Sequence, residues 1–359
     1  MHPLAQLLHE RIVIIDGAMG TTIQQYKLSE EQFRGERFKD WIGKDQHGKQ
    51  ILFVKGNNEL LNLTQPQIIE EIHRRYFEAG ADIAETNTFN GQFISLADYG
   101  MESLAYEMAF AGAQCARRAA DTVMAAQPGR KCFVAGALGP TTKTSSISTD
   151  VNDASARGTT WDELVAAYGE QTRALLDGGV DILLVETIFD TLNAKAAFFA
   201  IQQILEERGI SPVPFGTTEH PENAIPLMAS VTFIQKGGIR GVTGQTVEAF
   251  WNSLSNVPLL SVGMNCALGP EEMRPLIEEL AALAPIYVSV YPNAGLPNPL
   301  LPTGFPETPE SLAPQLAEWG RKGLFNIVGG CCGTTPPHIE KIAEAMRGIP
   351  SRQVKTAVL

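Results

Sequence analysis

Residues 177–187, DGGVDILLVET, hold the pattern that decides the fold. Two glycines end a helical stretch, and the unbroken apolar run 182–185 follows them. The same order of helix end, glycine and apolar run returns in EAGADIAET (78–86) and RKGLFNIVGG (321–330). Apolar runs without alternation are typical of parallel strands that are buried on both faces. The repeated pattern therefore predicts strand–helix units that follow one another along the chain.

Eight such runs lie along the chain: Ile12–Ile15, Ile83–Thr86, Phe133–Ala137, Ile182–Val185, Leu227–Val231, Leu260–Met264, Ile286–Val290 and Asn326–Val328. Helical patterns between them begin near Thr64, Thr160, Thr191, Pro270, Pro309 and Pro336. Thr or Pro at a start and Gly at an end are the usual helix-capping residues. Eight units predict an α/β fold, a closed (β/α)8 TIM barrel, with residues 1–359 as a single domain. The stretches 27–60 and 207–226 fit no unit, and we expect them to be surface insertions.

Composition excludes several classes of function. The chain has 359 residues, of which 44% are hydrophobic, and a formal net charge of −12 without any basic run. Proteins that bind nucleic acid or anionic membranes draw affinity from clustered Lys and Arg. No apolar run reaches the ~18 residues of a membrane helix, and the N-terminus lacks the pattern of a secretory signal. We therefore expect a soluble, cytoplasmic protein without nucleic-acid or membrane partners.

Three cysteines lie at the ends of two predicted strands. Cys266 ends the sixth strand in NCALGP (265–270), and Cys331 and Cys332 end the eighth in GGCCGTTP (329–336). Barrels place their chemistry at these carboxyl ends. Adjacent strand residues point to opposite faces, so both thiolates can face one ligand only because the flanking glycines let the chain turn. Three thiolates suit Zn²⁺, which keeps an open fourth position when it is catalytic.

Other interpretations of the cysteines stay open at this point. Free cysteines are often ordinary buried residues, which is our interpretation of Cys115 in a helix and Cys132 at the start of a strand. Buried packing is also the alternative for the adjacent pair. A cysteine nucleophile would need a histidine base, and none of the six histidines lies at a strand end. His338 lies closest, but it follows two prolines in the first turn of a helix, and we expect it on the surface.

The strand-end motifs together resemble the homocysteine S-methyltransferase family. They are DGAMGT (16–21), ETNTF (85–89), GALGPT (136–141), NCALGP, PNAGLPN (292–298) and GGCCGTTP. Four further segments are similar to the homocysteine-binding module of cobalamin-dependent methionine synthase: FRGERF (33–38), KGNNELL (55–61), DVNDASARG (150–158) and FDTLNAKAA (189–197). The paired cysteine motifs are highly specific, whereas DGAMGT alone is a weak signal. The stretches 43–54 and 211–224 depart from the usual pattern, which bears on loop geometry and not on the metal site.

The resemblance implies a zinc-dependent enzyme that methylates homocysteine to methionine. It assigns the zinc ligands to Cys266, Cys331 and Cys332. It also implies a weak oxygen donor at the fourth position in the absence of substrate, and the residue that matches this donor is Asn293. Zinc would bind and deprotonate the homocysteine thiol for attack on a methyl donor.

The resemblance further places Asp16 and Glu186 on the substrate, where their carboxylates would meet its ammonium group. Gly17 would offer a backbone N–H to the substrate carboxylate, and Glu85 would orient the site without direct contact. The alternative for Asp16 is that it caps its own turn, as Asp often does.

The methyl donor is a separate question. The wider resemblance favours methylcobalamin, bound elsewhere, whereas relatives with the same cysteines use S-methylmethionine or betaine. The 359 residues include no counterpart of the cobalamin-binding and folate-binding modules of the synthases, so we expect separate modules or proteins as partners. A different class of function also stays open, namely a binding module that presents homocysteine and turns over only when a cobalamin-bearing partner docks.

Overall fold

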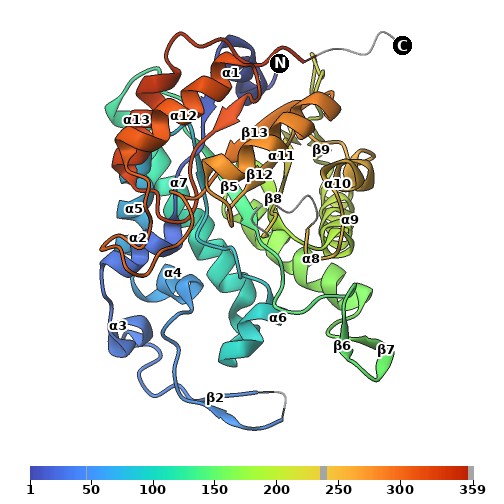
Figure 1. Cartoon of the computed structure of the whole chain (residues 1–359). Coiled ribbons are helices and arrows are strands. Elements are labelled where there is room, and N and C mark those ends of the chain that lie inside the picture. The colour runs from blue at the N-terminus through green and yellow to red at the C-terminus, as the bar shows by residue number, and fades with distance from the viewer. Residues whose placement is uncertain (46, 235–240, 355–359) are drawn as a thin grey trace.

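The computed structural model describes residues 1–45, 47–234 and 241–354, and eight parallel strands within them form one sheet (Figure 1). The strands are β1 (Val13–Ile14), β4 (Ile83–Glu85), β5 (Phe133–Leu138), β8 (Ile182–Ile188), β11 (Leu227–Val231), β12 (Ser261–Asn265), β13 (Tyr287–Tyr291) and β14 (Ile327–Val328). They neighbour one another in the order β1-β14-β13-β12-β11-β8-β5-β4. A parallel bridge between Ile15 and Ile83 joins the two outer strands. The predicted (β/α)8 barrel is confirmed, and each of the eight predicted apolar runs overlaps one of these strands.

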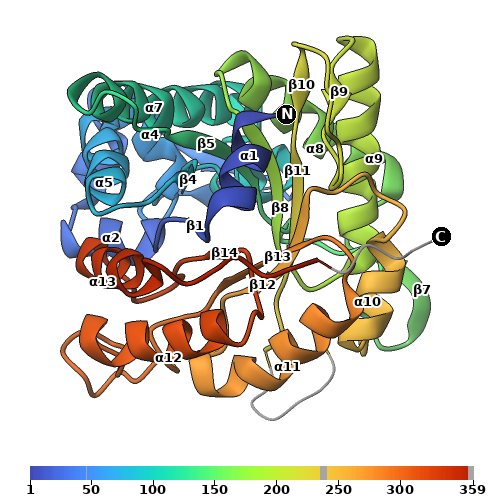
Figure 2. The same cartoon turned by 90° about the horizontal axis from the view of Figure 1, so that it is seen from above.

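A helix follows every barrel strand and packs on the outside of the sheet (Figure 2). In chain order these helices are α5 (Pro66–Glu78), α7 (Ala105–Ala126), α8 (Trp161–Asp177), α9 (Thr191–Glu207), α10 (Val247–Leu254), α11 (Pro270–Leu283), α12 (Pro309–Arg321) and α13 (Pro336–Met346). Shorter helices lie in the loops: α2 (Met19–Gln25), α3 (Glu30–Arg34), α4 (Leu61–Thr64) and α6 (Phe93–Leu96). Thr160 caps α8 in a capping box with Glu163, which satisfies N–H groups at the helix start as the sequence predicts.

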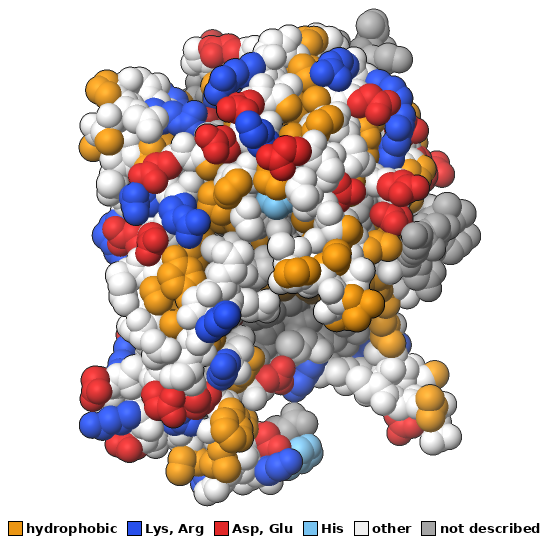
Figure 3. Space-filling model, turned by 60° about the vertical axis from the view of Figure 1, so that its left-hand side comes forward, with side chains coloured by type: hydrophobic (Ala, Val, Ile, Leu, Met, Phe, Trp, Pro, Cys, Tyr) orange, Lys and Arg blue, Asp and Glu red, His pale blue; other side chains and the backbone are white. Residues whose placement is uncertain are grey.

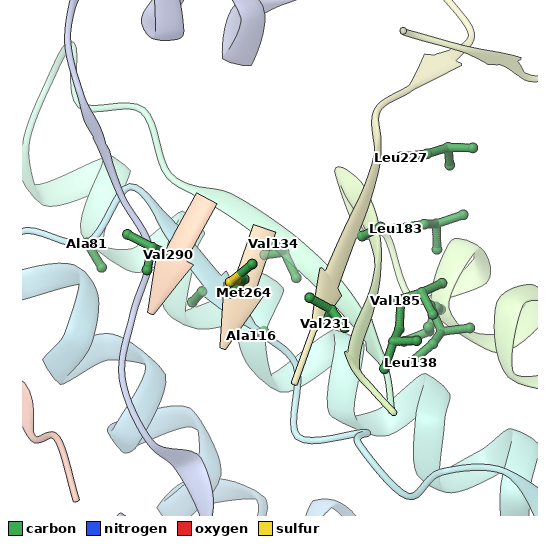
Figure 4. Close-up of a cluster of buried hydrophobic side chains, with 14 of the residues drawn as sticks. Ala81, Ala116, Val134, Leu138, Leu183, Val185, Leu227, Val231, Met264 and Val290 are labelled. Atoms are coloured by element: carbon green, nitrogen blue, oxygen red, sulfur yellow. The ribbon is translucent and has the colours of Figure 1, made fainter. Parts of the chain in front are cut away.

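Alternate residues of the barrel strands face two separate apolar layers. On β8, Leu183 and Val185 belong to the layer between sheet and helices, whereas Ile182 and Leu184 belong to the barrel interior. Figure 4 shows the outer layer, where Leu183 and Val185 lie near side chains of the neighbouring strands, such as Val231 of β11. Burial on both faces explains why the strands read as unbroken apolar runs.

The helix α1 (Pro3–Glu10) closes the amino-terminal end of the barrel (Figure 2). Its Leu4 and Leu8 are buried in the same cluster as the interior side chains of Val13 and Ile327. This end is therefore filled with apolar side chains, and the opposite, carboxyl end remains for polar residues.

The stretches predicted to be insertions form small additions to the barrel. Residues 27–60 include α3 and a hairpin of β2 (Gly43–Lys44) and β3 (Gln50–Ile51). Residues 207–226 include the short parallel pair β9 (Ser211–Pro212) and β10 (Ala224–Ile225). A further hairpin, β6 (Ser148–Asp150) with β7 (Asp153–Arg157), leaves the loop after β5. The β2–β3 and β6–β7 hairpins project at the bottom of Figure 1 from loops that follow the carboxyl ends of strands.

The surface agrees with the charge pattern of the sequence. On the face shown in Figure 3, acidic and basic side chains are interspersed and do not gather into one basic patch. None of the helices that the structure describes combines the length and apolar character needed to cross a bilayer.

Candidate metal centre

Three cysteine sulfurs converge at the carboxyl end of the barrel. Cys266 directly follows β12, and Cys331 and Cys332 come three and four residues after the end of β14. Their sulfur atoms all lie within 4.8 Å of one another, and the Sγ atoms of Cys266 and Cys332 are 3.8 Å apart. Tetrahedral zinc with Zn–S bonds of about 2.3 Å requires sulfurs about 3.8 Å apart. The three residues therefore fit a zinc ion.

The backbone around the cysteines departs from strand geometry in the way the glycines predict. The φ angle of Gly333 is 82°, and a Cβ there would lie 2.3 Å from the Phe305 ring. Cys266 itself has a φ of 61°. The N–H of Cys266 donates to Tyr291 O at 3.3 Å, and the N–H of Cys331 donates to Pro292 O at 2.8 Å. Both cysteine segments are thus hydrogen-bonded to the intervening strand β13 and the residue after it.

The sulfurs already interact with one another. Hydrogen bonds from the thiols of Cys266 and Cys331 lower the pKa of Cys332. Hydrogen bonds of Cys331 with Cys266 and Cys332, together with burial, raise the pKa of Cys331. The cluster therefore favours one thiolate stabilised by two thiols, and a bound cation would favour the remaining thiolates.

Asn293 lies beside this cluster, two residues after β13. It is 2% exposed, and its Oδ1 has no hydrogen-bond partner among the described residues. The next residue, Ala294, donates its N–H to Cys332 O at 2.9 Å. A buried amide oxygen without a partner is costly and needs an explanation. A weak ligand position on a metal would satisfy it, which fits the sequence-based assignment.

A cavity of about 210 Å³ opens beside the cysteines. Its lining includes the three cysteines and two carboxyl residues, Glu85 and Glu186. Asp16 is buried next to them, and its Oδ2 accepts a hydrogen bond from Glu85 N–H at 3.2 Å. Its other oxygen, Oδ1, has no partner among the described residues, and neither does Glu85 Oε1.

Burial controls the protonation of these carboxyl groups. It raises the pKa of Glu186 to about 8, and the negative charge of Cys266 adds to the effect. It also raises the pKa of Asp16 and of Glu85, with the neighbouring carboxyl groups as further causes. None of the described residues that line the cavity is Lys, Arg or His. The pocket therefore favours a ligand with a positive charge.

Gly17 is enclosed between two side chains. A Cβ at this position would lie 2.7 Å from Thr334 Oγ1 and 2.9 Å from Tyr76 Cε1, so a larger residue would displace one of them. Gly17 lines the cavity, and its N–H has no acceptor within the described part of the chain. This N–H is therefore available to an anionic group.

The structure places Gly17, Glu186 and the three cysteines around one cavity, with Asp16 buried beside Glu85, and it also shows residues that the sequence did not single out. Glu85, which we predicted only to orient the site, lines the cavity itself. Asn58 and Glu59 of KGNNELL also line it, although that segment was noted only as part of a resemblance. Asn265 makes four hydrogen bonds within the site region. Its position directly before Cys266 was the only available signal.

The prediction that His338 is a surface residue is wrong. The side chain is buried, and its Nε2 lies 3.1 Å from Glu307 O while its Nδ1 accepts a hydrogen bond from Thr335 N–H. A carbonyl can only accept, so Nε2 bears the proton and the ring is neutral. His338 joins the turn after the cysteines to the loop that holds Glu307. The capping interaction of His338 with Thr335 explains its burial in the first turn of α13.

Comparison with known protein families and solved structures gives matches over almost the whole chain. Residues 13–346 match the family described as homocysteine S-methyltransferase. The homocysteine methyltransferase MmuM of Escherichia coli is similar in its oxidized form, with a TM-score of 0.67, 21% identity, and coverage of 96% of this chain and 99% of that chain. Its metallated form gives a TM-score of 0.67 and 22% identity, with 95% and 98% covered. Its apo form gives 0.65 and 21%, with 95% and 98% covered.

Proposed function

Because this chain belongs to the homocysteine S-methyltransferase family, we propose that it transfers a methyl group to the sulfur of homocysteine and forms methionine. One observation supports this most directly: three cysteine sulfurs lie within 4.8 Å of one another at a cavity that also exposes carboxyl groups. The sulfurs suit a metal that binds a thiol, and the carboxyl groups suit the ammonium of an amino acid. A substrate that has both groups is an amino-acid thiol.

Zinc is the metal that this ligand set favours. A free thiol has a pKa of about 8.5 and is a poor nucleophile at neutral pH. Zinc, when bound, supplies the deprotonation of the substrate thiol and holds the resulting thiolate. Cys266, Cys331 and Cys332 would hold the ion, and their negative charges would keep the substrate sulfur electron-rich. Asn293 Oδ1 is the protein oxygen that we expect to yield its place to the substrate.

The remaining polar groups would bind the amino-acid end of homocysteine. Asp16 and Glu186 would pair with the ammonium, because both are buried carboxyl groups at a cavity whose described lining includes no basic side chain. The N–H of Gly17 would donate to the substrate carboxylate. Both carboxyl groups are almost fully buried, which strengthens each charge pair. No protein base is required once the thiol proton has left.

Methylcobalamin is the methyl donor that we propose, supplied by a separate cobalamin-binding module or protein. The support comes from KGNNELL, one of the segments similar to methionine synthase, because its Asn58 and Glu59 line the cavity. Folate-binding partners would then regenerate the donor. S-methylmethionine or betaine as donor, and a module that only presents homocysteine to a cobalamin-bearing partner, are the alternatives.

A methyl-transfer assay tests the proposal. The chain is incubated with homocysteine and, in separate reactions, methylcobalamin, S-methylmethionine or betaine, and methionine is measured. We expect methionine with methylcobalamin, none after Cys332→Ala, and unchanged activity after Cys115→Ala, since Cys115 is buried in α7 away from the cluster. If methionine forms with S-methylmethionine or betaine but not with methylcobalamin, the compound that supports the reaction is the donor. A chain that neither methylates homocysteine nor binds it in calorimetry would contradict the proposal.

A further inference from the structure

Asn265 is a fully buried residue at the end of β12, directly before Cys266. Both the oxygen and the nitrogen of its side-chain amide form hydrogen bonds. The oxygen Oδ1 accepts hydrogen bonds from Thr187 N–H at 3.1 Å and from Ser230 Oγ at 2.7 Å. The nitrogen Nδ2 donates to Thr187 Oγ1 at 2.8 Å and to Glu186 Oε2 at 3.4 Å. One amide thus connects the end of β12 with the ends of β8 and β11.

The partner Thr187 has an unusual backbone conformation. Its φ is 53°, in the left-handed region that β-branched residues rarely adopt. Such strain persists only where the surroundings fix it. Asn265 bonds both the N–H and the hydroxyl of Thr187, so it stabilises this conformation directly. Cys266, the neighbour of Asn265, has a φ of 61°, so the amide joins two strained strand ends.

The carboxyl group of Glu186 depends on this arrangement. Among the described residues, the hydrogen-bond donors to Glu186 Oε2 are Asn265 Nδ2 and Thr187 Oγ1, each at 3.4 Å. Both are long bonds, and the second depends on Thr187, which Asn265 also holds. Asn265 therefore acts on the Glu186 carboxylate both directly and through Thr187.

We propose that Asn265 is a positioning residue that fixes the Glu186 carboxylate relative to the Cys266 sulfur, so that the pocket selects thiols bearing an α-ammonium group. The inference rests on the proposed function, in which the metal binds the substrate sulfur and Glu186 meets the ammonium. Because Cys266 follows Asn265 in the chain, the same residue sets the spacing between the two groups. Substrate selectivity should then depend on Asn265, although it contacts neither the metal nor the reacting atoms.

The test compares two thiols that differ only in the ammonium group, homocysteine and 4-mercaptobutanoate. Their affinities are measured by calorimetry on the zinc-loaded wild type, Asn265→Ala and Asn265→Asp. The Asp variant keeps the shape and the acceptor oxygen of the side chain but lacks the donor to Glu186. It can therefore replace the Ala variant in the test if the Ala variant does not fold. In both variants we expect zinc to remain and the preference for homocysteine to fall about tenfold or more. The affinity for 4-mercaptobutanoate should change little.

A matched control is Asn326→Ala. Asn326 is also fully buried, just before β14, where its amide bonds Val288 N–H, Ser351 Oγ and Arg352 O. Its loss should lower stability but leave the preference unchanged. The inference would be overturned if a zinc-loaded Asn265 variant preferred homocysteine over 4-mercaptobutanoate as strongly as the wild type does. Loss of zinc from both variants would also overturn it, since Asn265 would then act on the metal ligand. A wild type that binds neither thiol would instead contradict the proposed function.

Discussion

At the scale of single residues, the charge of Glu186 depends on what occupies the pocket. Burial raises its pKa to about 8, so the side chain is largely protonated near neutral pH in the free protein. An ammonium beside it would stabilise the carboxylate and lower this pKa. Substrate binding should therefore remove a proton from the protein as well as from the thiol.

This coupling predicts the number of protons released when homocysteine binds. Near pH 7 we expect more than about one proton, because the thiol and Glu186 both ionise, and Asp16, whose pKa is also raised and which would meet the same ammonium, can release a further one. The number should fall as the pH rises above the pKa of Glu186, since the free carboxyl group has then already lost its proton. Calorimetry in buffers of different ionisation enthalpy measures it. In Glu186→Gln the number should drop by about one near pH 7, with at least about a tenfold loss of affinity, and equal numbers in the two proteins would refute the coupling.

Asn293 provides a second prediction at this scale. Its buried Oδ1 lacks a partner among the described residues, which fits a ligand that leaves the metal when substrate binds. Asn293→Ala should therefore leave homocysteine affinity unchanged or increase it, because no protein oxygen competes. X-ray absorption of the zinc-loaded chain should show a fourth sulfur in place of an oxygen or nitrogen on homocysteine addition. Weaker binding in the variant would show instead that Asn293 contacts the substrate.

Sequence reasoning found the cysteine cluster but not the residues that support it. Cys331 and Cys332 were recognisable because glycines surround them at a strand end, a local signal. The role of Asn265 depends on Glu186 and Thr187, almost eighty positions earlier in the chain. A pattern along one chain does not reveal which distant groups a buried amide will face. His338 was misplaced for the same reason, since its partner Glu307 lies in another loop.

At the scale of elements, the strands could be predicted, and so could the positions of two of the small additions, but not the hairpins. Burial on both faces gives each barrel strand an apolar run that stands out from the sequence. The strand β8 nevertheless continues to Ile188, beyond the predicted end at Val185. The apolar run stops at Val185, whereas the strand also includes the polar residues Glu186 and Thr187. The hairpins β2–β3 and β6–β7 bury little, so their composition is that of any surface loop. Helix α1 closes the barrel, a role that only the three-dimensional arrangement shows.

The contact between β1 and β4 closes the barrel, and Asp82 supports this contact. This residue is 1% exposed, and its carboxylate binds the Arg11 guanidinium through two hydrogen bonds of 2.7 and 2.8 Å. It also accepts the N–H of Ile14 at 2.9 Å, and Arg130 lies 3.3 Å away. The carboxylate thus joins the start of β4 to β1 at the amino end of the barrel.

Asp82→Ala should lower the free energy of unfolding by about 3–5 kcal/mol, because a buried partner is removed and backbone and guanidinium donors lose their acceptor. Denaturant titration measures the change. The control is Glu78→Ala, which breaks the exposed pair of Glu78 with Arg74 and should cost less than about 1 kcal/mol. Similar losses in the two variants would show that Asp82 has no special part in closing the barrel.

At the scale of the whole molecule, the core and the metal site are separate. The barrel interior is filled by apolar side chains from α1 and the strands, and a second apolar layer lies between the sheet and the helices. The three cysteines lie in loops beyond the ends of β12 and β14, and none of them is a member of either layer, although Cys331 packs against the interior one. A zinc finger lacks such a core and unfolds without its metal. This barrel has an apolar core, and the metal site is not part of that core.

Removal of zinc by a chelator should therefore leave the chain folded. We expect the far-ultraviolet circular dichroism of the metal-free protein to match that of the zinc-loaded protein, with at most a modest fall in melting temperature, because only the loss of ligand binding to the folded state lowers stability. Homocysteine binding should disappear and return when zinc is restored. The variant Cys332→Ala, with the cluster broken, should also fold and show the spectrum of the metal-free wild type. Global loss of the helix signal on chelation would mean that the cysteines hold a structural metal, and the open ligand position on which methyl transfer depends would lose its support.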